Sequence, residues 1–164
     1  MNQTYTIKNF RVFDKQGATF ELAPLTILTG CNSSGKSSMT KSLMLLSPLM
    51  SQYKKDILAG TFGGFSGTGF SSYDLDFTRG KHNLGSLEKV VNWDSKETTF
   101  TMSYSIFSHA LGLMMDVVLT FGKPYEDKNS QTLHAQLQKV EIRHNDRVFY
   151  KYKCGNTDSK DIFT

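Results

Sequence analysis

The stretch LTILTGCNSSGKSS, residues 25–38, decides the fold of this chain. It opens with an almost wholly apolar run bounded by Pro24 and Gly30, which predicts a strand that is buried on both faces. Residues 30–37 then match the pattern G-x-x-x-x-G-K-[ST]. A helical pattern follows from Ser37, so the motif lies between a predicted strand and a predicted helix, as a phosphate-binding loop requires.

Each residue type in this loop has a physical role in binding phosphate. Gly30 and Gly35 permit turns that a Cβ would obstruct. Consecutive backbone N–H groups of residues 33–38 would surround a β-phosphate, and the positive end of the helix would point at it. The Lys36 ammonium would reach the β- and γ-phosphates, while the Ser37 hydroxyl would coordinate a bridging Mg²⁺.

The sequence therefore predicts a binding site for ATP and Mg²⁺, with Lys36 as the catalytic candidate and Ser37 as the metal ligand. The predicted binding residues are Gly30, Asn32, Ser33, Ser34, Gly35, Lys36, Ser37 and Ser38. The alternative interpretation is a turn rich in Gly, Ser and Lys that only joins a strand to a helix.

The elements on either side of the loop follow from local patterns. Residues 4–13 alternate partly between apolar and polar types and predict a half-buried strand, and DKQG at 14–17 predicts a turn. A second strand is predicted over 18–23. In the helix after the loop, one face is predicted to carry Met39, Leu43, Leu46 and Met50, and Pro48 is expected to end or kink it near the third turn.

The C-terminal half shows short β-like runs. Residues 59–72 contain five glycines and no charge, which predicts an irregular surface excursion. Residues 84–93 predict a short helix or a loop that packs Leu87, Val90 and Trp93. Strands predicted between 98 and 153 form an antiparallel sheet in a β-rich lobe over 82–153.

Composition and charge restrict the class of protein. The chain has 164 residues, of which 38% are hydrophobic and 21% charged, enough for one folded domain. The net charge of +4 allows contact with phosphates but does not by itself indicate nucleic acid. No apolar stretch approaches the roughly 20 residues of a transmembrane helix, and the N-terminus lacks the pattern of a secretory signal. With only two distant cysteines, we predict a cytoplasmic protein without membrane insertion.

The segments TIKNFRVFD and LTILTGCNSSGKSS resemble the N-terminal head segment of ABC-type ATPases of the SMC and RecF group, including the OLD-like AAA ATPases. The match is close at Asn32, Lys36, Ser37 and Ser38, and HNLGSLEKVVNW resembles the β-rich lobe of the OLD-like branch. The resemblance implies an α/β P-loop NTPase fold with an antiparallel β lobe and an incomplete α/β core. Residues 1–164 would be the N-terminal part of one head domain, with the Walker A region at 24–50.

The resemblance also implies partners. Heads of this group pair across the nucleotide, so we expect a homodimer or a second ATPase head. The remaining C-terminal half of the head and DNA are expected as further partners, in repair, chromosome maintenance or phage defence. The segment around Arg11 and the start of the second strand are expected to approach the nucleotide base, although the Arg11 side chain itself is predicted to be an exposed edge-strand residue.

Several family motifs have no counterpart in this chain. The family head needs an apolar strand ending in Asp-Glu, an LSGGQ-like signature and a switch His. Asp116 imitates the first, and Gln52 is the candidate for the family's metal-contacting glutamine. Hydrolysis would therefore require segments from elsewhere. Two alternatives are a non-catalytic nucleotide-binding assembly module and the ATPase subunit of a transporter. A nucleotide kinase would instead alternate strands with helices through residues 60–164 and form a parallel sheet.

Overall fold

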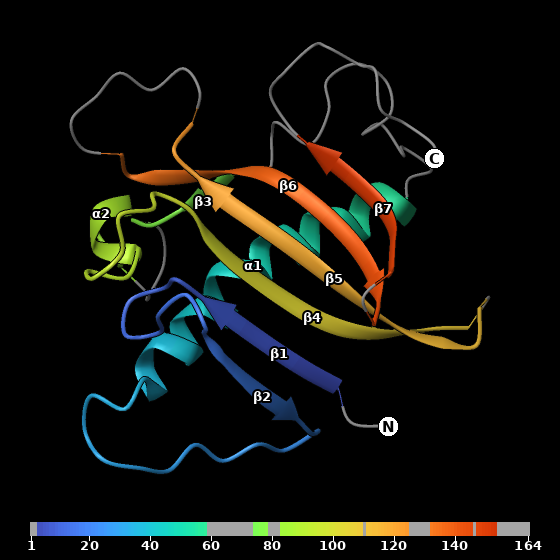
Figure 1. Ribbon diagram of the computed structural model, residues 1–164, viewed down its shortest axis with the longest axis horizontal. Helices are drawn as coiled ribbons and strands as arrows, with labels where there is room; N and C mark the ends of the chain where they lie inside the picture. The colour runs from blue at the N-terminus through green and yellow to red at the C-terminus, as the bar shows by residue number, and fades with distance from the viewer. Residues whose placement is uncertain are drawn as a thin grey trace.

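A computed structural model describes residues 3–58, 74–78, 83–109, 111–124, 132–145 and 147–153. They form a twisted sheet with one long helix, α1, lying across one face (Figure 1). The elements in chain order are β1 (Gln3–Lys8), β2 (Ala18–Leu22), α1 (Lys36–Leu58), β3 (Asp74–Asp76), α2 (Leu87–Val90), β4 (Phe100–Ser108), β5 (Leu113–Gly122), β6 (His134–His144) and β7 (Arg147–Lys153). The predicted glycine-rich stretch, 59–72, lies outside the described residues.

The strands that the structure describes pair in the order β2-β1-β4-β5-β6-β3, with β7 also paired to β6, and every pair is antiparallel. The predicted hairpin of the first two strands is confirmed, since Tyr5 lies opposite Phe20. The predicted junction between this hairpin and the later sheet is also confirmed, since Tyr5 lies opposite Tyr104 on its other side. The parallel sheet of a kinase is therefore excluded for the described residues.

The core lies between the sheet and α1. Alternate side chains of the central strands, such as Ile7, Met102 and Leu119, are buried there. At one end the rings of Phe10 and Phe121 flank Phe100, each with its ring centroid 5.5 Å from that of Phe100. Successive side chains of a strand point to opposite faces, so one face of this sheet is buried against α1. The observed burial therefore agrees with the alternating pattern from which the sequence predicts a β-rich lobe.

The helix α1 buries a face that differs from the predicted one. Met39 and Leu46 are buried as expected, but Leu43 is 36% exposed and Leu45 is buried in its place. Ser42 is fully buried: its hydroxyl donates to the Met39 carbonyl at 2.7 Å and accepts from the Tyr5 hydroxyl at 3.0 Å. The hydrogen bonds satisfy a small polar residue on the core side, which a hydrophobic pattern cannot detect. Met50 also lies in α1, outside the described side chains.

The helix does not end at Pro48, which lies inside it. A proline in this position leaves the carbonyl of Met44 without its intrahelical amide partner. Pro48 and its neighbour Ser47 are exposed, so water can reach that carbonyl. The lost hydrogen bond therefore weakens α1 without ending it.

The first strand is shorter than predicted. It ends at Lys8 because Asn9 and Arg11 have left-handed backbone angles, with φ of 55° and 51°. The chain reverses there, and Phe10 and Phe13 exchange hydrogen bonds of 2.9 Å. The side-chain amide of Asn9 donates to the carbonyl of Thr99 at 2.6 Å, which joins this turn to the start of β4.

The predicted buried strand at 25–29 is not formed. These residues are irregular, and Leu25 and Ile27 are 79% and 76% exposed. Within the described ranges, the paired neighbour of β2 is β1, and no strand pairs with 25–29. An apolar run becomes a buried strand only where neighbours satisfy its backbone and cover both faces. The α/β core expected around the loop is therefore absent from the described structure.

Candidate phosphate-binding site

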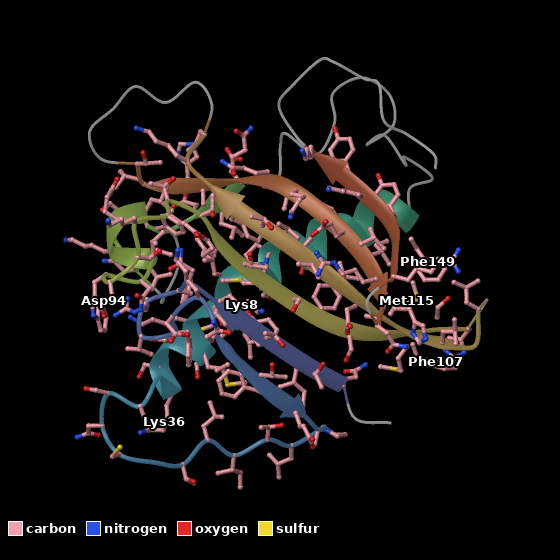
Figure 2. The ribbon with its side chains drawn as sticks, viewed as in Figure 1. Lys8, Lys36, Asp94, Phe107, Met115 and Phe149 are labelled. Carbon is pink, nitrogen blue, oxygen red and sulfur yellow. The ribbon has the colours of Figure 1, made fainter. Side chains whose placement is uncertain are left out.

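The loop of residues 30–35 joins the irregular segment 23–29 to α1, whose first residue is Lys36 (Figure 2). Three left-handed or glycine-type conformations curl it, at Gly30 (φ 136°), Ser33 (φ 65°) and Gly35 (φ 94°). A Cβ on Gly35 would lie 2.7 Å from a ring carbon of Phe13 and 3.0 Å from a methyl carbon of Val12. Glycine is thus required at position 35 by both backbone conformation and space.

The Lys36 ammonium lies over the loop. Its Nζ donates to the carbonyl of Gly30 at 2.7 Å and to the carbonyl of Cys31, and its distance to Ser34 Oγ is 3.4 Å. An ammonium group has three protons, so two firm bonds to carbonyls leave one proton with only a long contact. A phosphate oxygen can replace the Ser34 hydroxyl while the two carbonyls hold the charge in place.

The N-terminus of α1 adds backbone donors to the same place. The amide of Met39 makes the first intrahelical bond, 2.8 Å to the carbonyl of Gly35. The amides of Lys36, Ser37 and Ser38 precede this bond and have no partner one helical turn back. No acidic residue occurs in the first turn of α1, so its positive end is not neutralised there. This arrangement suits an anion.

The predicted binding residues all lie on this loop and the first turn of α1. Most are exposed, including Asn32, Ser33, Ser34 and Ser37. Ser38 is buried and lies one turn before the buried Ser42. No group of three or more His, Cys, Asp or Glu that could hold a metal occurs in the described part of the chain.

A second segment supports the loop from the side. The turn that carries Arg11 contacts the loop through Val12 and Phe13, as the clearance around Gly35 shows. Contrary to the edge-strand prediction, Arg11 lies in a tight turn and is half-buried. Its amide donates to the carbonyl of Val90 at 2.8 Å, and its carbonyl accepts from the side-chain amide of Asn92 at 2.6 Å.

The residues after α2 expose a side chain that was predicted to be packed. Leu87 and Val90 are buried as expected, but Trp93 is 70% exposed. Asp94, the exposed charged residue that follows Trp93, is the signal in the sequence that indicates exposure, whereas Asn92 is polar but buried. The prediction that Trp93 packs beside Val90 assumed helical spacing, in which residues three apart share a face. This spacing does not apply to Trp93, because α2 ends at Val90.

The other candidate residues lie apart from the loop or outside the description. Asp116 is in the middle of β5, opposite Ser105 on β4 and Arg143 on β6. Gln52 lies in α1, and its side chain is outside the described ones.

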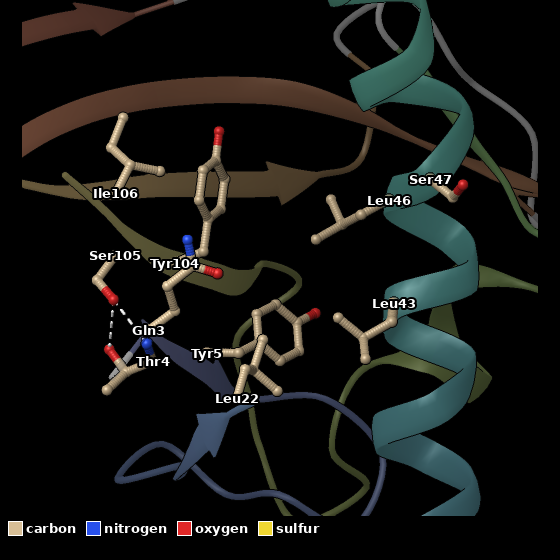
Figure 3. A pocket seen from close by; sticks show the side chains of 10 residues that line it. All are labelled: Gln3, Thr4, Tyr5, Leu22, Leu43, Leu46, Ser47, Tyr104, Ser105 and Ile106. Carbon is tan, nitrogen blue, oxygen red and sulfur yellow. Dashed lines mark hydrogen bonds between the residues drawn. The ribbon is translucent and has the colours of Figure 1, made fainter. Parts of the chain in front are cut away.

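A groove of about 250 Å³ opens between α1 and the sheet, where β1 begins, β2 ends and the C-terminal half of β4 runs (Figure 3). Apolar residues such as Leu22, Leu43 and Ile106 line it together with polar uncharged ones, and none of its ten lining residues is charged. The lining offers no charge to a phosphate. The groove is therefore distinct in position and chemistry from the loop at 30–38.

No helix among the described residues has the length and apolar character needed to cross a bilayer. Comparison with known proteins identified no relative: no protein family, curated protein or solved structure matches this chain significantly.

Proposed function

We propose that this chain binds ATP with Mg²⁺ through residues 30–38. The observation that carries the proposal is the Lys36 ammonium, held over a glycine-bounded loop by the carbonyls of Gly30 and Cys31. The amides that open α1 and the positive end of this helix belong to the same loop-to-helix junction, and such a junction binds phosphate where donors and positive charge combine. The Ser37 hydroxyl is exposed at the first turn and would coordinate Mg²⁺ together with phosphate oxygens and water.

The wider proposal is that residues 1–164 form the N-terminal part of an ABC-type ATPase head of the SMC, RecF and OLD-like group. The antiparallel lobe and the loop before α1 support it. In such a head, hydrolysis draws a carboxylate and a signature segment from other parts of the head, and ATP joins two heads. A second head, the rest of the head and DNA are the proposed partners, in a cytoplasmic setting.

The exposed segment 25–29 agrees with this proposal. Leu25 and Ile27 form an apolar run directly before the loop, and they lack cover in the described structure. In a complete head this run would be a strand of the α/β core. In an independent nucleotide-binding module, by contrast, no further part of the protein would cover Leu25 and Ile27.

The alternative is a non-catalytic nucleotide-binding module, in which ATP only sets a conformation. The position of Asp116 is compatible with it, because this carboxylate lies in the middle of β5 and not on the loop or on α1. The third alternative, a transporter ATPase subunit, has no specific observation in its favour.

Calorimetric titration with MgATP tests the binding proposal. Lys36→Ala is expected to weaken binding at least tenfold, because a charge-assisted hydrogen bond contributes about 1.5–3 kcal/mol. Lys41→Ala is the matched control, since it removes the same charge from α1 beyond its first turn. The control should bind as wild type does. Equal affinities of Lys36→Ala and wild type would refute the proposed site, provided that circular dichroism shows both to be folded.

A further inference from the structure

Trp93 is a large exposed aromatic side chain on a firmly held segment. It is the only tryptophan of the chain, and it is 70% exposed. The three residues before it, Val90, Val91 and Asn92, are all buried. An indole offers a large apolar face for contact, and Trp93 leaves most of its side chain open to solvent while the segment that carries it is packed.

This segment is joined to the turn that supports the phosphate-binding loop. The Asn92 amide donates to the carbonyl of Asn9 at 3.3 Å, and its side chain donates to the carbonyl of Arg11 at 2.6 Å. Phe10 and Val91 form a β-bridge between the same two segments. Since Val12 and Phe13 of the turn lie against Gly35, a short chain of contacts connects Trp93 to the loop.

The placement in space agrees with these contacts. Asp94, the next residue after Trp93, and Lys36 lie toward the same end of the molecule, the end at which α1 begins (Figure 2). The turn at 9–13 lies in this region as well (Figure 1). A nucleotide held at the loop by its phosphates has its ribose and base beyond the loop, over neighbouring surface.

We propose that Trp93 stacks on the base of the nucleotide whose phosphates bind at residues 30–38. This inference rests on the proposed function and adds the part of the ligand that the loop cannot recognise. An indole and a base offer flat π-faces to each other, and such stacking tolerates different bases. The exposed ring needs no rearrangement of the core to receive one. Trp93 is thus a binding residue for the nucleoside, and the loop is the binding site for the phosphates.

Because Trp93 is the sole tryptophan, its fluorescence reports on this contact directly. Titration with MgATP is expected to quench the emission in a saturable manner. Titration with magnesium tripolyphosphate, which has phosphates but no base, is expected to occupy the loop and compete with ATP without quenching. Quenching of equal size by both ligands would overturn the stacking, because it would then not depend on the base.

Calorimetry of variants completes the test. Trp93→Ala is expected to bind MgATP about tenfold more weakly, the loss expected for one base–aromatic stack, and to bind tripolyphosphate unchanged. Trp93→Phe should retain most of the affinity for MgATP. The matched control is Leu111→Ala, another exposed apolar side chain, in the turn between β4 and β5; it should change neither affinity.

The outcomes separate this inference from the proposed function. If Lys36→Ala weakens both ligands while Trp93→Ala binds MgATP as wild type does, the base does not stack on Trp93 and the phosphate site stands. If Trp93→Ala weakens both ligands equally, its role is structural and the inference is wrong. If Lys36→Ala binds both ligands as wild type does, the phosphate site itself fails.

Discussion

Glu141 illustrates how a charge is stabilised on this sheet. It alternates with the core residue Val140 on β6 and is nevertheless buried. Its carboxylate lies 3.0 Å from Lys139 Nζ and 2.6 Å from Arg143 Nη2. Burial alone would raise the pKa of the Glu141 carboxyl, but the hydrogen bonds and charges of these two cations outweigh burial and lower it. The carboxylate is therefore ionised and paired at neutral pH.

Glu141→Gln is expected to destabilise the fold and to remove part of its acid sensitivity. A carboxyl whose pKa is lower in the folded than in the unfolded state stabilises the fold at pH values above its unfolded pKa, and this stability is lost as pH falls through the folded pKa. We expect a loss of about 1–3 kcal/mol at pH 7 and a shallower decline of stability below about pH 4.5, the ordinary value. Urea unfolding at pH 7 and at pH 3 measures both effects.

The control for this change is Glu97→Gln. Glu97 pairs with Lys15 at 2.8 Å, but both side chains are more than half exposed. An exposed pair contributes little, so Glu97→Gln should leave unfolding nearly unchanged at both pH values. A Glu141→Gln variant with the stability of wild type at pH 7 would show that the buried pair is not stabilising.

At the scale of the element, α1 carries both the proposed phosphate site and a break in its own hydrogen bonds at Pro48. Its N-terminus presents the unpaired amides, its buried face packs on the sheet, and Pro48 interrupts its hydrogen bonds. Tertiary packing holds the helix together across the proline, because buried residues lie before it and Leu49, directly after it, is partly buried.

Pro48→Ala is therefore expected to stabilise the chain. The substitution restores an amide donor and removes the clash of the proline ring with the preceding turn, which together are worth up to about 3 kcal/mol in a helix interior. Thermal and urea unfolding give the measurement, and Ser47→Ala, an exposed neighbour that has its amide already, serves as the control. A lower midpoint for Pro48→Ala than for wild type would mean that α1 needs the bend or rigidity of the proline.

At the scale of the whole molecule, the proposed phosphate site and the carboxylate that the sequence offers for hydrolysis lie on different elements of the described structure. A water attacking the γ-phosphate must be oriented by a nearby group. The candidate carboxylate of the sequence, Asp116, lies on β5 within the antiparallel sheet. The proposed phosphate site instead lies where α1 begins, at Lys36.

We accordingly expect residues 1–164 to bind MgATP but to hydrolyse it far more slowly than an ordinary enzyme, which turns over on the order of 1 s⁻¹ or faster. Phosphate release from purified chain, compared with Lys36→Ala to reveal contaminating ATPases, gives the rate. Turnover near 1 s⁻¹ that disappears in Lys36→Ala would contradict this expectation. The role of Asp116 would then be tested by Asp116→Asn.

The sequence by itself determined what depends on neighbours along the chain. The glycines, Lys36 and the helix start at residues 30–38 follow from local backbone requirements, and the hairpin of β1 and β2 follows from period-2 patterning around a turn. The antiparallel character of the later sheet follows from short strands without long helices between them. These features need no knowledge of distant contacts.

Only the tertiary structure decided what depends on a partner distant in sequence. The buried face of α1 centres on Ser42 because Tyr5 of β1 supplies its hydrogen bond, and residues 25–29 are no strand because no described strand lies beside them. Trp93 is exposed because the segment after α2 binds the turn at 9–11 through its backbone and the side chain of Asn92. The physical reason is common to all three. Burial and hydrogen bonding depend on which groups meet in space, whereas a pattern along the chain shows only which side chains would be stabilised by burial if a partner covered them.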